Sequence, residues 1–317
     1  MPQGKIVVRA TLGRAQILAR MTAIAGERIL AVDDEAALIA GIAEAEAVTL
    51  TNPDYNAKVA AALGAAAPRV KWLQFLTAGT DALAQYGAPA GLVVTSAGDA
   101  YSPAVGAHAV SLLLALQRHL ATFLANKNWD RSAAPRLLTP AEQTIAVLGF
   151  GGIGQEVARL LRPFGARIVA VTRSATPHPL ADEVERIGAL PAVLARADAV
   201  VVALPLADTT QGLIGKEALA RMKPHAVLVN IARGAIVDSL ALAAVLKEGR
   251  IAGAGLDVTD PEPLPPGHEL WSAPNLIVTP HVAGACGPLA GVRLAAVAGE
   301  NLTRFLVGQP LAHIVPR

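Results

Sequence analysis

From Thr144 onward, short runs of apolar and β-branched residues alternate with segments in which apolar residues recur at helical spacing. This alternation predicts a parallel sheet whose strands are joined by crossover helices. The apolar runs are nearly continuous, which is typical of strands covered on both faces. The predicted strands are 145–148, 167–171, 198–204, 226–231, 252–258 and 276–279, and the predicted helices are 152–164, 216–222 and 239–248.

Residues 1–97 show a weaker alternation of the same kind, with predicted strands at 5–8, 47–51, 70–75 and 92–95 and alanine-rich helical segments between them. Apolar residues at helical spacing over 103–126 predict one long helix between the two regions. The polar, proline-containing segment 127–140 is expected to be a loop or an arm. The whole pattern predicts an α/β protein with two parallel-sheet domains.

Composition narrows the class of protein. Of the 317 residues, 53% are hydrophobic and 16% are charged, so the chain is expected to fold around a large core. A net charge of +2 argues against nucleic acid as a partner. The single cysteine, Cys286, excludes a disulfide scaffold. The longest apolar runs, 109–116 and 199–206, are shorter than a membrane span, and the first residues lack a secretion-signal pattern, so we expect a cytoplasmic protein.

A glycine-rich turn follows the strand predicted at 145–148. Its sequence is Gly-Phe-Gly-Gly-Ile-Gly over 149–154, and a helix is predicted directly after it. In this context the pattern favours a dinucleotide-binding turn, with Gly149 in the tight turn, Gly151 approaching a pyrophosphate and Gly154 packing helix against strand. The alternative is a glycine-rich turn that binds no ligand.

The next predicted strand ends in Thr172, Arg173 and Ser174, where an NAD-specific site would have an acidic residue. Arg173 can pair with a 2′-phosphate, and the two hydroxyls can donate hydrogen bonds to it. We therefore predict NADP as the preferred cofactor. Use of NAD, alone or together with NADP, is the alternative, in which Arg173 is an ordinary solvated arginine.

Three polar residues follow successive predicted strands, Arg233 after 226–231, Glu262 after 252–258 and His281 after 276–279. Ligands of open parallel sheets bind at this edge. Arg233 can hold a carboxylate and a carbonyl oxygen, His281 can exchange a proton with that oxygen, and Glu262 can fix the histidine tautomer. The set predicts hydride transfer at a 2-oxo or 2-hydroxy acid. Singly, each residue could equally be a surface, capping or turn residue.

Several segments around these residues resemble the D-isomer-specific 2-hydroxyacid dehydrogenase family. The resemblance is strong from about Leu92 to Gly284. It rests on LPL at 204–206, GLIG at 212–215, MKP at 222–224, NIARG at 230–234, GLDV at 255–258, PEP at 261–263, LW at 270–271 and TPHVAG at 279–284.

The resemblance implies Arg233, Glu262 and His281 as the catalytic set, and Asp257 as a ligand of the nicotinamide carboxamide. It implies a substrate-binding domain of 1–97 plus 287–317, a Rossmann domain of 98–286, a cleft between them, and a homodimer formed through 103–126 and the arm. The cofactor-binding candidates are Gly149, Gly151, Gly152, Ile153, Gly154, Thr172, Arg173, Ser174, Leu204, Pro205, Thr210, Ile231, Ala232, Asp257 and Gly284. The substrate-binding candidates are Leu50, Thr51, Leu76, Ala78, Gly79, Arg233 and His281.

The expected activity is NADPH-dependent reduction of a small 2-oxo acid such as glyoxylate or hydroxypyruvate. Alternatives are a dehydrogenase of another small acid, such as formate or phosphite, and a non-catalytic protein of the same fold that senses dinucleotides. The remaining histidines have no metal-ligand spacing, so we expect no metal. Ala107-His108 departs from the Glu-His of many relatives, His225 replaces a usual glycine, and Cys286 replaces Ser or Thr.

Overall fold

The computed structural model describes residues 4–125, 129, 137–285 and 287–316. The chain divides into two compact units, Met1–Tyr101 with Ala285–Arg317 (unit 1) and Ser102–Gly284 (unit 2). The sequence predicts these boundaries at 97/98 and 286/287, close to the observed 101/102 and 284/285. The N-terminal and C-terminal segments thus lie in one unit, and the other is inserted between them.

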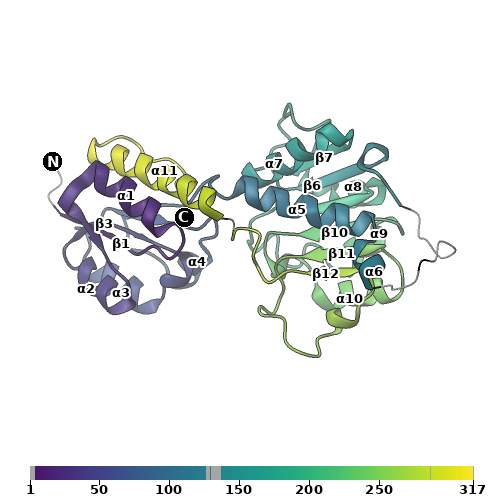
Figure 1. The fold of residues 1–317 in the computed structure, drawn as a ribbon, viewed down its shortest axis with the longest axis horizontal. Helices are drawn as coiled ribbons and strands as arrows, with labels where there is room; N and C mark the ends of the chain where they lie inside the picture. Colours follow the sequence, from purple (N-terminus) through teal and green to yellow (C-terminus); the bar gives the residue numbers. More distant parts are fainter. Residues whose placement is uncertain (1–3, 126–128, 130–136, 286, 317) are drawn as a thin grey trace. The chain divides into compact units, whose positions relative to one another are not determined.

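Unit 1 is built on a five-stranded parallel sheet in the order β2-β1-β3-β4-β5. In Figure 1, α1 and α11 lie side by side on one face, where Gly13 meets Gly291, and α2 and α3 lie on the other. The strands are β1 (Lys5–Val8), β2 (Ile29–Ala31), β3 (Ala45–Leu50), β4 (Trp72–Phe75) and β5 (Val93–Thr95), and the helices are α1 (Arg14–Ala25), α2 (Glu35–Ile42), α3 (Ala57–Ala65), α4 (Asp81–Tyr86) and α11 (Gly287–Leu306).

Unit 2 is built on a seven-stranded parallel sheet in the order β12-β11-β10-β9-β6-β7-β8 (Figure 1). Its strands are β6 (Thr144–Leu148), β7 (Arg167–Thr172), β8 (Glu183–Arg186), β9 (Ala199–Val202), β10 (Val227–Asn230), β11 (Gly253–Leu256) and β12 (Leu276–Val278). Its helices are α5 (Ser102–Gln117), α6 (Leu120–Ala125), α7 (Gly152–Leu161), α8 (Leu190–Arg196), α9 (Lys216–Arg221) and α10 (Ser239–Lys247).

The predicted fold class is confirmed, since both sheets are parallel and their strands alternate with helices. The central strands β9 and β10 are buried throughout and β6 is buried except at Thr144, as their apolar runs predicted. The single long helix predicted over 103–126 is wrong. Its first part, α5, ends at Gln117 and α6 begins at Leu120, because His119 between them has a φ of 48°, in the left-handed region.

Two strands were not predicted, β2 and β8, and both lie at a sheet edge. The charged sequence of β8, Glu-Val-Glu-Arg, lacks the apolar run that marks a central strand. An edge strand needs less burial, so its sequence carries a weaker signal.

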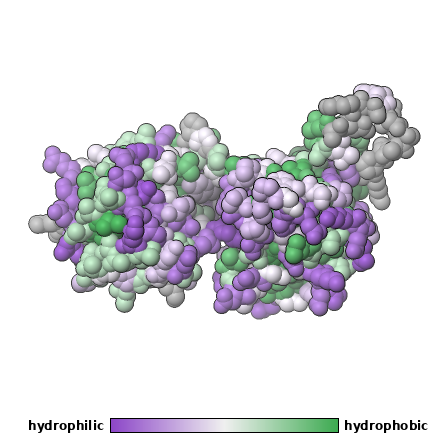
Figure 2. All heavy atoms as spheres, turned by 90° about the horizontal axis from the view of Figure 1, so that it is seen from below, coloured by the Kyte–Doolittle hydropathy of each residue, from purple (hydrophilic) through white to green (hydrophobic). Residues whose placement is uncertain are grey.

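The surface is mixed in polarity. On the face seen in Figure 2, hydrophilic side chains lie among scattered apolar ones on both units, as on ordinary globular proteins. Among the described residues, no helix combines the length and the apolar character needed to cross a membrane.

Candidate functional site

The carboxyl edge of the unit 2 sheet carries the three residues predicted to be catalytic. Strands β10, β11 and β12 are neighbours in the sheet. Arg233, Glu262 and His281 lie in the segments that follow these three strands. Because all three strands run the same way, the three segments lie at one edge of the sheet.

Arg233 follows a tightly bonded turn at the end of β10. The buried Asn230 side chain accepts a hydrogen bond from Ala232 N at 3.1 Å and donates one to Arg233 O at 2.9 Å. Gly234 comes next, and a Cβ there would lie 2.0 Å from the backbone carbon of Thr259. The absence of a side chain at Gly234 therefore allows the segment after β10 to touch the segment after β11, which leads to Glu262.

Glu262 and His281 form a hydrogen-bonded pair. Glu262 Oε1 lies 2.6 Å from His281 Nδ1, and Glu262 Oε2 accepts from Thr259 N at 3.4 Å. A carboxylate only accepts hydrogen bonds, so the hydrogen is on Nδ1 of the imidazole. Since the side chains of Glu262 and His281 are 42% and 50% exposed, Nε2 can take part in proton exchange with a bound molecule.

Asp257 holds the backbone of the His281 segment. Its carbonyl oxygen accepts from His281 N at 2.8 Å, and its buried carboxylate accepts from Val282 N at 3.0 Å and Ala283 N at 2.9 Å. His281 has a φ of 52°, a conformation that is unfavourable by about 1 kcal/mol or more for a residue with a side chain. The three hydrogen bonds offset this strain and keep the imidazole in place.

The glycine-rich turn joins β6 to α7. Gly149 has a φ of 91°, and a Cβ there would lie 2.5 Å from Ala203 O. At Gly154 a Cβ would lie 2.1 Å from Gly149 O. At Gly151, by contrast, φ is −77° and a Cβ would meet nothing within 4 Å. The protein itself therefore requires glycine at 149 and 154, whereas the open space at 151 is the space that a pyrophosphate approaching the backbone needs.

The first amides of α7 lie beside this open space. Gly152 and Ile153 stand in the first turn, where helix geometry leaves N–H groups without an intrahelical partner. Such amides and the helix dipole favour an anion. The turn thus fits the pyrophosphate of a dinucleotide.

At the end of the neighbouring strand β7, Arg173 and Ser174 are exposed. Thr172 Oγ1 accepts from Ala175 N at 3.0 Å, and Ser174 Oγ accepts from Thr176 Oγ1 at 3.0 Å. Among the described residues, Arg173 has no hydrogen bond or ion pair. Its guanidinium is therefore available to an anionic ligand.

The other cofactor candidates lie at the carboxyl edge after β9 and β10 and near the end of unit 2. Thr210 braces the segment after β9, since its Oγ1 donates to Pro205 O and accepts from Ala207 N, both at 2.8 Å. Leu204 is partly buried, Ile231 and Ala232 are buried, and Gly284 ends unit 2.

In unit 1 the substrate candidates lie after β3 and β4, again at the carboxyl edge of adjacent strands. Leu50 is the last residue of β3 and is fully buried. Thr51 Oγ1 donates to the buried Asp54 carboxylate at 2.5 Å, and that carboxylate pairs with Arg9 at 3.2 Å.

The segment after β4 contains Leu76, Ala78 and Gly79. Tyr101 donates its hydroxyl to Leu76 O at 2.9 Å. Within the described part of the chain, the backbone N–H groups of Ala78 and Gly79 make no hydrogen bond. These two amides can therefore bind an anion such as a carboxylate.

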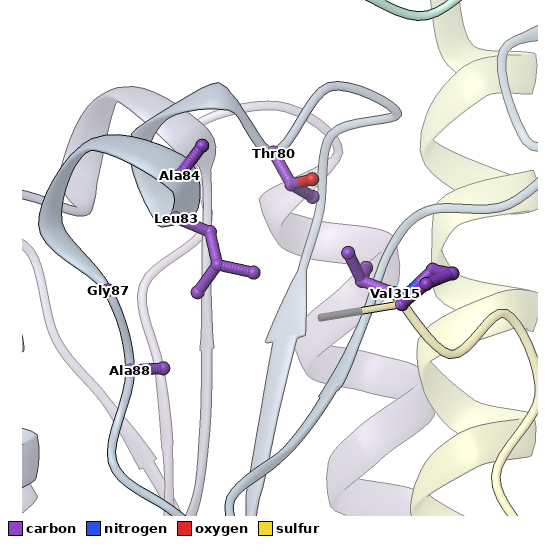
Figure 3. Close-up of a pocket in the computed structure, with 7 residues that line it drawn as sticks. Thr80, Leu83, Ala84, Gly87, Ala88 and Val315 are labelled. Atoms are coloured by element: carbon purple, nitrogen blue, oxygen red, sulfur yellow. The ribbon is translucent and has the colours of Figure 1, made fainter. Parts of the chain in front are cut away.

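A separate cavity of about 470 Å³ opens in unit 1. Figure 3 shows α4 and the segment after it on one side of the cavity and Val315 from the C-terminal segment on the other. Its described lining is apolar except for Thr80 and holds no ionisable side chain. The cavity lacks the groups that proton or hydride chemistry needs.

No group of three or more His, Cys, Asp or Glu side chains in the described ranges is arranged to hold a metal ion. Cys286 and most of the arm predicted at 127–140 lie outside the described residues.

Sequence reasoning assigned no role to Asn230, Thr279 and His108. Thr279 Oγ1 donates to Asp257 at 2.6 Å, and His108 Nε2 lies 3.0 Å from Thr279 Oγ1. Asn230 lies in the motif NIARG and Thr279 in the motif TPHVAG, but the hydrogen bonds of their side chains leave no periodic pattern in the sequence. His108 lies on α5, and the sequence drew attention to it only because its neighbour Ala107 differs from the Glu of a Glu-His pair.

Comparison with known proteins agrees with this geometry. The family description "D-isomer specific 2-hydroxyacid dehydrogenase, NAD binding domain" matches residues 110–283. The glyoxylate reductase of Pyrococcus furiosus is 38% identical over 228 residues, 69% of this chain and 67% of that protein. The human glyoxylate reductase/hydroxypyruvate reductase is 34% identical over 257 residues, 78% of each chain.

Among solved structures, a D-isomer specific 2-hydroxyacid dehydrogenase from Xanthobacter autotrophicus Py2, in complex with NADPH and MES, is similar to this chain with a TM-score of 0.82. It is 29% identical, and the match covers 99% of this chain and 98% of that one. The chain therefore belongs to the D-isomer specific 2-hydroxyacid dehydrogenase family and is an NAD(P)-dependent oxidoreductase.

Proposed function

We propose that the protein is a cytoplasmic, homodimeric reductase of small 2-oxo acids, glyoxylate or hydroxypyruvate in kind, that prefers NADPH to NADH. The observation that carries the proposal is the 2.6 Å bond between Glu262 Oε1 and His281 Nδ1, at the sheet edge that also bears Arg233. In this proposal unit 2 binds the dinucleotide and unit 1 binds the substrate.

The proton chemistry follows from the tautomer. When the carbonyl carbon of the oxo acid accepts a hydride, its oxygen gains negative charge and needs a proton. His281 Nε2–H donates that proton, and the Glu262 carboxylate on Nδ1 stabilises the ring while it is positively charged. Arg233 offers a planar set of N–H donors to the substrate carboxylate and carbonyl oxygen. The reduced nicotinamide, when bound, supplies the hydride.

The chain's own residues would hold the cofactor at three places. The amides of Gly152 and Ile153 bind the pyrophosphate, with Gly151 leaving room for it. Arg173 pairs with the 2′-phosphate, and Thr172 and Ser174 supply hydroxyls next to it. Leu204, Pro205, Thr210, Ile231, Ala232, Asp257 and Gly284 form the remaining contacts.

On the substrate side, the free amides of Ala78 and Gly79 bind the carboxylate of the oxo acid. Leu50, Thr51 and Leu76, which are held in place by burial and by the bonds to Asp54 and Tyr101, are small or apolar residues and favour a short substrate side chain. A small substrate such as glyoxylate fits these short, largely apolar positions.

The acid–base assignment is tested with His281→Ala. We expect glyoxylate and hydroxypyruvate reduction, followed by absorbance of the nicotinamide, to fall by about 10² to 10⁴-fold, because the proton donor is lost. NADPH affinity, measured by fluorescence titration, should stay within a few-fold. His225→Ala is the matched control, since His225 pairs with Asp198 just before β9, at the amino edge of the sheet. Reduction by His281→Ala at a near wild-type rate would refute the proposal.

Cofactor preference is tested with Arg173→Asp. We expect wild-type kcat/KM to favour NADPH and the variant to favour NADH, because a carboxylate repels the 2′-phosphate and accepts bonds from ribose hydroxyls. Arg250→Asp makes the same charge change just before β11, at the amino edge of the sheet, and should leave the preference unaltered. A wild-type preference for NADH would overturn the role given to Arg173.

A further inference from the structure

His108 contacts the network that holds the proposed catalytic histidine. It lies on α5, and its Nε2 is 3.0 Å from Thr279 Oγ1 and 3.4 Å from Asp257 Oδ1. Thr279 Oγ1 is in turn 2.6 Å from the same Asp257 oxygen. Asp257 is 2% exposed and binds the backbone on both sides of the His281 side chain.

The register of α5 against β11 explains why His108 reaches this network. Leu112, one helical turn after His108, packs over Gly255, where a Cβ would lie 3.1 Å from Leu112 Cβ. Moving one turn toward the start of α5 covers about 6 Å, and moving two residues along β11 covers about 6.8 Å. The same helix face therefore brings His108 to Asp257. Gly255 permits the close approach of helix and strand that this contact needs.

The hydrogen atoms in this network can be assigned from the available donors and acceptors. Thr279 has one hydroxyl hydrogen, and the 2.6 Å distance to the Asp257 carboxylate commits it there. Thr279 Oγ1 can then only accept from His108, so the hydrogen on His108 must be at Nε2. That same N–H also points its positive end toward the Asp257 carboxylate at 3.4 Å.

We propose that His108 is a positioning residue for the reaction, and this inference rests on the proposed function. Its Nε2–H fixes the Thr279 hydroxyl and lies 3.4 Å from the buried Asp257 carboxylate, which also accepts from the Thr279 hydroxyl and from the amides of Val282 and Ala283. These bonds hold His281 at its positive φ, with the imidazole directed to Glu262. Without His108, Thr279 Oγ1 loses the donor that holds it in place beside Asp257, and the segment can relax away from the strained conformation.

Kinetics of four variants test the proposal, namely His108→Leu, His108→Gln, Thr279→Val and the double variant His108→Leu/Thr279→Val. His108→Leu should lower kcat for glyoxylate by about 10-fold, equivalent to the loss of one hydrogen bond, and leave the KM for the oxo acid within about threefold. His108→Gln, whose amide also places an N–H donor near the end of the side chain, should restore kcat to within about twofold of wild type. In the double variant with Thr279→Val, the two losses of kcat should not add, because both substitutions break the same hydrogen-bonded chain from His108 through Thr279 to Asp257.

A spectroscopic measurement separates positioning from stability. NMR of protein labelled with ¹⁵N-histidine, assigned by comparison with His108→Gln, should show a hydrogen on His108 Nε2. A hydrogen on Nδ1 with Nε2 unprotonated would overturn the proposal. So would full kcat in His108→Leu, losses that add in the double variant, or failure of His108→Gln to restore kcat. Retained turnover in His281→Ala would instead refute the proposed function and leave the NMR result standing.

Discussion

At the scale of single residues, the glycines of the turn at 149–154 are required for different physical reasons. Gly154 has no room for a side chain, because a Cβ would lie 2.1 Å from Gly149 O. Gly151 has open space and an ordinary φ of −77°. Gly154 is therefore needed for packing, whereas Gly151 is needed only if a ligand lies against the turn.

This difference predicts that alanine at one position weakens ligand binding and that alanine at the other lowers stability. Gly151→Ala should leave the unfolding temperature close to wild type and weaken NADPH binding by about 10-fold or more, because the methyl group occupies ligand space. Gly154→Ala should lower the free energy of unfolding by about 1 to 3 kcal/mol through overpacking. Thermal unfolding and fluorescence titration measure the two effects. Unchanged NADPH affinity in a stable Gly151→Ala protein would contradict the ligand-based explanation.

Position in the chain relative to a strand explains which site residues could be predicted from the sequence. Arg233, Glu262 and His281 each follow an apolar strand, so their common edge could be deduced from the pattern alone. His108 is 149 positions before Asp257 and meets it only through the packing of α5 on β11. Contacts of this kind depend on helix register in space, which periodicity within one segment does not specify.

At the scale of elements, the central strands were predictable, whereas the edge strands β2 and β8 were not, although the edge strands β5 and β12 were. Apart from Thr144 and Asn230 at their ends, strands β6, β9 and β10 consist of buried apolar residues, and such runs can be recognised in the sequence. Strand β8 pairs with β7 at the sheet edge, is only partly buried, and carries side-chain ion pairs in addition to its backbone hydrogen bonds. Glu183 accepts from Arg196, with one of the two bonds at 2.7 Å, and from Arg167 at 3.2 Å. Its polar sequence therefore resembles a loop.

The ion pairs of β8 predict a pH-dependent stability. The hydrogen-bonded Arg196 guanidinium lowers the pKa of Glu183 to about 2, with Arg167 adding to the effect and partial burial opposing it. Because the folded-state pKa lies below the ordinary value of 4.5, this stabilisation is present above about pH 4.5 and is lost as the pH falls toward 2.

Glu183→Gln should therefore lower the free energy of unfolding by roughly 1 kcal/mol or less at pH 7, since the pair is partly exposed. The difference from wild type should shrink between pH 4.5 and pH 2 in urea unfolding experiments. Glu269→Gln, which breaks the more exposed pair with Lys247, is the control and should have a smaller effect. A difference that stays constant down to pH 2 would argue against the ion pair as its source.

At the scale of the whole molecule, the exposed apolar side chains of α6 bear on the proposed dimer. Leu120, Phe123 and Leu124 are 47%, 39% and 74% exposed on this short helix. Trp129, four residues beyond α6, is 93% exposed. Single exposed apolar residues are common, but a group on one element marks an interaction surface. We propose that a second copy of the chain covers this group.

Phe123→Asp should then convert the dimer to a monomer, because the contact would bury a carboxylate that lacks a partner. Size-exclusion chromatography with light scattering distinguishes the 32.5 kDa monomer from the dimer. Leu240→Asp is the matched control, since Leu240 is 60% exposed on α10 of the same unit, and its loss should leave the dimer intact. A wild-type protein that runs as a monomer at micromolar concentration, or a Phe123→Asp variant that stays dimeric, would place this surface outside any dimer contact.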